Sequence, residues 1–194
     1  MNHWGYYLRG WLLENLGRRE GAVDDYRLAL RAKQGFARAR NRLAYTLARL
    51  ERHREAEPHF RAVLQAEPQN AVAHFNLGYT LDKRGLHAEA IEAFLNATRL
   101  APKIDRAWYG LGHAYAALGR HAEAANALRH AADLQPMNPH AWYALGMAHH
   151  ALGEGEKLRE VARHLVRFDP VMGRRLIRDS GAKDLEHLVA DLAV

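Results

Sequence analysis

The sequence repeats itself every 34 residues, and this period restricts the possible folds more than any other feature of the chain. Small residues recur at this spacing across five units: Gly10, Ala44, Gly78, Gly112 and Gly146. An alanine series and a series of large apolar residues keep the same period: Ala22, Ala56, Ala90 and Ala124, then Tyr26, Phe60, Phe94 and Leu128. Several series in one register indicate a tandem array of a single structural unit.

Each unit carries apolar residues at the spacing of two amphipathic helices. Prolines close the units at Pro68, Pro102, Pro136 and Pro170. Glycines stand at the expected turn between the helices, where a left-handed backbone is often required: Gly17, Gly85, Gly119 and Gly153. Glu51 replaces glycine in the second unit, so we expect that turn to be strained or differently shaped. The predicted fold class is all-α, with stacked antiparallel helix pairs.

This pattern resembles the tetratricopeptide repeat, in which Trp-x2-Leu-Gly-x2-Tyr is followed by Ala-x3-Phe, Ala and Pro. The fourth unit matches best, with Trp108, Leu111, Gly112 and Tyr115. The resemblance covers residues 3–172 as five repeats and implies a right-handed α–α superhelix, a solenoid. The repeats are 3–36, 37–70, 71–104, 105–138 and 139–172.

Two repeats depart from the family pattern. The first has Arg9 where leucine is usual and Gln34 where proline is usual, which suits an atypical terminal repeat. The fifth has Leu158 in the place of the small alanine and Ala162 in the place of the aromatic residue. Because large and small residues have exchanged places, we expect conserved volume with altered local packing.

Residues 173–194 follow the last repeat and are expected to form a C-terminal capping region. Gly173–Asp179 could form a short helix. Residues 182–193 are predicted to form an amphipathic helix with one apolar face: Leu185, Leu188, Val189 and Leu192. We expect this face to cover the fifth repeat, the alternative being a tail that binds a partner.

The composition argues against catalysis and metal binding. Cysteine is absent, which excludes disulfides, thiolate chemistry and cysteine-bound zinc. The 13 histidines lack the close spacing of zinc sites, so neither a metal nor another cofactor is expected. There is no Gly-rich phosphate loop or nucleophile elbow, and Ser180 is the only serine. Without such catalytic motifs, the chain is not expected to be an enzyme. Without a signal-like N-terminus or a long apolar stretch, it is expected to be cytoplasmic.

The family resemblance implies that the first helix of each repeat lines a concave groove. We expect partner-binding residues there: Tyr7, Trp11, Arg38, Asn41, Arg42, Tyr45, Phe75, Asn76, Tyr79, Arg106, Tyr109, His113, Tyr143 and Met147. The ladder of Tyr7, Phe75, Tyr109 and Tyr143 falls where the family often has tyrosine, so simple packing is an open alternative. The ladder of Trp11, Tyr45, Tyr79, His113 and Met147 is not part of the family pattern and favours binding.

Charge indicates the kind of partner. The formal net charge is +6, and residues 1–104 carry all of it. Arg38, Arg42 and Arg106 can pair with carboxylates, so we expect a protein scaffold or adaptor that binds an acidic peptide or helix. The alternative is nucleic acid, because arginines beside aromatic rings can bind single strands. The neutral C-terminal half argues against that alternative, and the sequence does not fix the oligomeric state.

Overall fold

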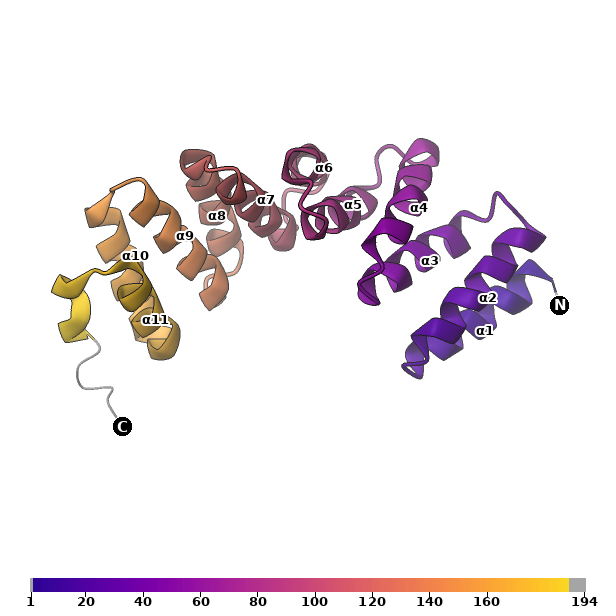
Figure 1. The fold of residues 1–194 in the computed structure, drawn as a ribbon, viewed down its shortest axis with the longest axis horizontal. Coiled ribbons are helices and arrows are strands. Elements are labelled where there is room, and N and C mark those ends of the chain that lie inside the picture. Colours follow the sequence, from indigo (N-terminus) through magenta and orange to yellow (C-terminus); the bar gives the residue numbers. More distant parts are fainter. Residues whose placement is uncertain (1, 189–194) are drawn as a thin grey trace. The chain divides into compact units, whose positions relative to one another are not determined.

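The computed structural model describes residues 2–188 of the chain. These residues form eleven α-helices and one 3-10 helix, with no strand, which confirms the predicted all-α repeat fold. The chain divides into two compact units, residues 1–100 and residues 101–194, called here the N-terminal and C-terminal units. Each unit is built from consecutive helix pairs (Figure 1).

The helices begin at intervals of 34 residues. The first helices of the pairs are α1 (His3–Asn15), α3 (Ala37–Arg49), α5 (Ala71–Lys83), α7 (Asp105–Ala117) and α9 (Pro139–Ala151). The second helices are α2 (Arg19–Ala32), α4 (His53–Ala66), α6 (His87–Leu100), α8 (His121–Leu134) and α10 (Gly155–Phe168). The helix bounds agree with five repeats over residues 3–172, and this assignment of repeats stays a prediction.

The turn between the helices of each pair has the same left-handed backbone in all five pairs. Gly17, Gly85, Gly119 and Gly153 have φ between 69° and 76°, and Glu51 has φ 60°. The hydrogen bonding is shared as well, since the Arg52 amide donates to the Leu47 carbonyl at 3.0 Å, as Leu86 does to Leu81. The turn at Glu51 is therefore strained, as one predicted alternative had it, but it is not differently shaped.

Small residues on the first helices admit large side chains from the second helices. A methyl group added at Gly78 would lie 2.7 Å from the Phe94 ring, and one at Gly112 would lie 2.5 Å from Leu128. Phe94 and Leu128 are almost fully buried, together with Tyr26 and Phe60 in the same series. This close approach explains why glycine or alanine recurs there.

The last helix pair is packed differently. Ala162 of α10 is too short to reach Gly146, and the space over Gly146 is filled by Leu176 of α11 (Pro170–Ser180). A methyl group at Gly146 would lie 2.6 Å from Leu176, which is fully buried. The lost volume is thus restored by a third helix, and not only by the exchange with Leu158.

Pro170 begins α11 directly after α10, so it opens a helix as well as ending one. The Asp169 side chain caps α11 by accepting from the Met172 amide at 2.9 Å. Beyond α11, the predicted α-helix over residues 182–193 is wrong in its described part, where Lys183–Leu188 form the 3-10 helix η1. Leu185 is buried and Leu188 is half-buried, whereas Val189 and Leu192 lie outside the described residues.

Candidate partner-binding face

Three aromatic rings stand at equivalent positions on the first helices of the N-terminal unit. They are Trp11 on α1, Tyr45 on α3 and Tyr79 on α5, and their exposed fractions are 45%, 38% and 42%. Each ring is the ninth residue of its 34-residue repeat. The three rings therefore lie on the same side of their helices. Large exposed rings of this kind are unusual on a solvated surface and are typical of binding anchors.

Cationic side chains lie over the rings of this surface. The Arg38 guanidinium lies 5.6 Å from the Trp4 ring centroid, the Arg49 guanidinium 5.8 Å from Tyr45, and the Lys83 ammonium 5.5 Å from Tyr79. Within residues 2–188, these cations have no carboxylate partner. We call this surface the first-helix face: Trp11, Tyr45 and Tyr79 with Arg38, Arg49 and Lys83.

The other predicted ladder is half-buried in this unit. The Tyr7 ring lies 5.9 Å from Tyr26 and 5.3 Å from Phe36, and Phe75 lies 6.2 Å from Phe94. These contacts join first helices to second helices and to the connecting loop. Tyr7 and Phe75 therefore contribute to packing, which was the open alternative for this ladder.

Arg42 is already engaged inside the N-terminal unit. Its guanidinium lies 3.6 Å from the Glu14 carboxylate, whose side chain is only 7% exposed. The Tyr26 hydroxyl donates to the same carboxylate at 2.8 Å. Burial raises the pKa of Tyr26 well above its ordinary value, and the hydrogen bond to Glu14 adds to this effect. Arg42 thus links α3 to α1. Two other predicted binding residues of this unit, Asn41 and Asn76, are half-buried.

A second ion pair in this unit was missed at the sequence level. Arg9 donates to both carboxylate oxygens of Asp25, whose side chain is 3% exposed. Arg9 was noticed as a departure, but its partner was not. A signal was present, because Asp25 stands where the third, fourth and fifth repeats have Ala93, Ala127 and Val161, although the second has His59. A buried acidic residue at a position that is apolar in three of the other four repeats calls for a buried partner.

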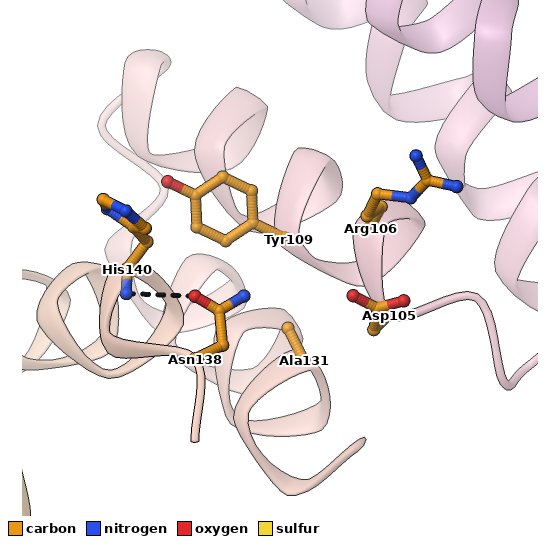
Figure 2. Close-up of a pocket in the computed structure, with 6 residues that line it drawn as sticks. All are labelled: Asp105, Arg106, Tyr109, Ala131, Asn138 and His140. Atoms are coloured by element: carbon orange, nitrogen blue, oxygen red, sulfur yellow. Dashed lines mark hydrogen bonds between the residues drawn. The ribbon is translucent and has the colours of Figure 1, made fainter. Parts of the chain in front are cut away.

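The C-terminal unit carries a small cavity of about 270 Å³ between α7, α8 and α9. Figure 2 shows its lining: Asp105, Arg106, Tyr109, Ala131, Asn138 and His140. The His140 amide donates to the Asn138 side chain at 3.1 Å, which holds the start of α9. Burial raises the pKa of Tyr109. The structure thus brings two predicted residues, Arg106 and Tyr109, to one cavity.

The remaining candidates of this unit differ in exposure. His113 is exposed on α7, and Met147 is half-buried on α9. Tyr143 is engaged by α11, because its hydroxyl donates to Asp179 at 2.8 Å and the Arg175 guanidinium lies 5.1 Å from its ring. Burial and this hydrogen bond raise the pKa of Tyr143, and the same bond, with Arg178, lowers that of Asp179. Tyr143 therefore anchors the C-terminal helix.

The described residues contain neither a cluster of metal ligands nor a helix that could span a membrane. Among residues 2–188, His, Asp and Glu side chains do not gather in threes in a way that could hold a metal ion. None of the described helices has the length and apolar character needed to span a membrane.

The fold and the first-helix positions define an α-helical tandem-repeat protein. Models of the tetratricopeptide repeat match residues 7–71, 41–103 and 75–132, and a TPR repeat model matches residues 112–153. These matches span well over half of the sequence. The chain belongs to the tetratricopeptide repeat family.

Solved structures of this family share the fold. A MamA protein superposes with a TM-score of 0.82 at 20% identity, covering 87% of this chain and 92% of its own. YrrB, a TPR protein with an unusual peptide-binding site, gives 0.79 at 22% identity over 89% and 90%. MamA from residue 41 of Desulfovibrio magneticus RS-1 gives 0.78 at 21% over 91% and 96%. No curated protein sequence matches this chain.

Proposed function

We propose that the chain is a cytoplasmic adaptor that binds an acid-rich segment of a partner protein along the first-helix face. The observation that carries this proposal is the row of exposed rings at Trp11, Tyr45 and Tyr79. Such rings bury much area on binding and lose little conformational freedom, so they serve as apolar anchors. Peptide binding by YrrB, which has the same fold, supports a binding role over a catalytic one.

The cations on the first-helix face favour an acidic partner. Arg38, Arg49 and Lys83 rest on aromatic rings, and stacking leaves their N–H groups available to carboxylates. The N-terminal part of the chain also carries the net positive charge, which attracts acidic segments over a distance. Rings supply affinity and cations set the register and the sign of the partner.

The C-terminal unit would contribute separately. The cavity at Asp105, Tyr109 and His140 has a carboxylate, a phenol and an imidazole around it. We assign it the capture of a single polar side chain of the same partner. Tyr143 takes no direct part in this proposal, because α11 already occupies its hydroxyl.

Peptide display tests this function with no assumption about which protein the partner is. Random peptides selected on the full chain should be enriched in Asp and Glu beside apolar residues. Replacing both Tyr45 and Tyr79 with Ala should weaken the selected peptide by about 2 kcal/mol, roughly 30-fold in Kd. The matched control is Leu95→Ala, which removes a side chain with a 44% exposed fraction from α6 and should leave Kd unchanged.

Charge reversal separates attraction by the face from attraction by net charge. The double variant Arg38→Glu/Arg49→Glu should slow peptide association about tenfold at low salt. The control Arg31→Glu/Arg54→Glu changes the net charge equally but alters exposed residues of α2 and α4. Failure to select peptides, together with tight and steeply salt-dependent binding of a single-stranded oligonucleotide, would instead support the nucleic-acid alternative.

A further inference from the structure

Helix α1 presents an uncharged apolar surface to solvent. Five large side chains form it, with exposed fractions from 40% to 64%: Trp4, Leu8, Trp11, Leu12 and Leu16, the last at the C-cap. Their spacing places them on one side of the helix. We call this set the α1 band. A continuous apolar strip along a whole helix is what a helix–helix interface requires, not what a solvated helix requires.

The later first helices show that the α1 band is a departure from the repeat. The position of Leu12 corresponds to Thr46, Thr80, Ala114 and Ala148, which are small and at most 4% exposed. Helices α3, α5 and α9 each pack against second helices on two sides, whereas α1 packs mainly against α2. Leu12 is large and half exposed where its counterparts are small and covered. A helix stacked as closely as the internal ones would collide with it.

The arrangement of the α1 band fits a second copy of the same helix. Trp4 and Leu16 lie equally far from residue 10, as do Leu8 and Leu12. In an antiparallel pair of α1 helices centred there, each Trp4 faces a Leu16 and each Leu8 faces a Leu12. A two-fold interface brings identical surfaces together, so an uncharged band causes no repulsion. The adjacent Arg9 is neutralised by Asp25.

We propose that two copies of the chain associate through the α1 band as an antiparallel helix pair. Covering five such side chains on each copy removes on the order of 1,000 Å² from water, which is the lower end of specific interfaces. The dimer is therefore expected to form reversibly at micromolar concentration. This inference goes beyond partner binding. It shares Trp11 with the first-helix face, so dimerisation and peptide binding compete at that ring, whereas Leu8, Leu12 and Leu16 lie outside that face.

Sedimentation equilibrium of the full chain tests the association. The mass should rise from one chain toward two between about 1 and 100 µM, the range expected of a small interface. The double variant Leu8→Arg/Leu12→Thr carries the residues of the second unit, Arg42 and Thr46, and should stay a single chain at all concentrations. The control Leu118→Arg alters the position equivalent to Leu16, with a 45% exposed fraction, and should still double in mass.

Cysteine cross-linking tests the register, since the chain has no native cysteine. Chains with Trp4→Cys mixed with chains with Leu16→Cys should form a disulfide-linked dimer. Leu16→Cys alone should not, because an antiparallel pair centred at residue 10 separates the two copies of that position by about 18 Å. If the sedimentation mass stays that of a single chain at all concentrations, the proposal is overturned. That result is expected if the α1 band instead binds a helix of a partner protein. A mass that doubles in Leu8→Arg/Leu12→Thr, or cross-linking of Leu16→Cys with itself, also overturns the proposal.

Discussion

At the scale of single residues, Glu51 is the clearest point of strain. It has a left-handed backbone with φ 60°, where the other four turns have glycine. A side chain in this conformation costs roughly 1 kcal/mol. The sequence indicated strain because the missing glycine is visible in the repeat. It could not show which alternative would hold, since the retained shape depends on the packing of both flanking helices.

Glu51→Gly should therefore raise the free energy of unfolding by about 1 kcal/mol, measured by urea denaturation. Gly119→Glu places the same residue in the equivalent turn of the fourth pair and should lower it by a similar amount. Equal stability of all three proteins would show that the turn stores no strain.

The Arg9–Asp25 pair shows the limit of residue-level inference. Each residue was readable as a departure from the repeat, but their contact joins α1 to α2 and depends on helix rotation. Arg42 shows the same limit. Its role in binding a partner stays a prediction, and its contact with Glu14 joins α3 to α1 in a way that the repeat pattern does not show.

At the scale of elements, the 34-residue period made the first ten helices predictable, because apolar spacing, turn glycines and closing prolines all agreed. The C-terminal elements escaped this reasoning, since no repeat guides them. That Leu176 covers Gly146 could not be predicted, because the contact spans 30 residues and replaces the one made within the other pairs. The sequence indicated only that Ala162 left space.

Leu176→Ala should destabilise the chain by about 2–5 kcal/mol, because it opens a cavity over Gly146 in a fully buried site. Thermal or urea unfolding monitored by circular dichroism measures the effect. Val171→Ala alters the same helix at a side chain that is 81% exposed, and it should change stability by less than about 0.5 kcal/mol. If the two variants prove equally stable, α11 is not the element that closes the fifth pair.

At the scale of the whole molecule, the candidate site divides into a predictable and an unpredictable part. The ladder of Trp11, Tyr45 and Tyr79 follows from the repeat, because equivalent positions on equivalent helices share one side. The engagement of Tyr143 was not predictable, since α11 lies beyond the repeats and contacts that ring. Together with the basic charge of residues 1–104, the exposed rings make the first-helix face the main proposed binding surface.

The most direct measurement is a titration of the isotope-labelled full chain with a display-selected acidic peptide, followed by backbone amide chemical shifts. Binding at the first-helix face should give the largest changes around Trp11 on α1, Tyr45 on α3 and Tyr79 on α5, and at the Trp11 indole N–H. Amides on the outer sides of α2, α4 and α6 should barely move. Changes confined to α2, α4 and α6, with those three aromatic positions unaffected, would contradict binding at the first-helix face.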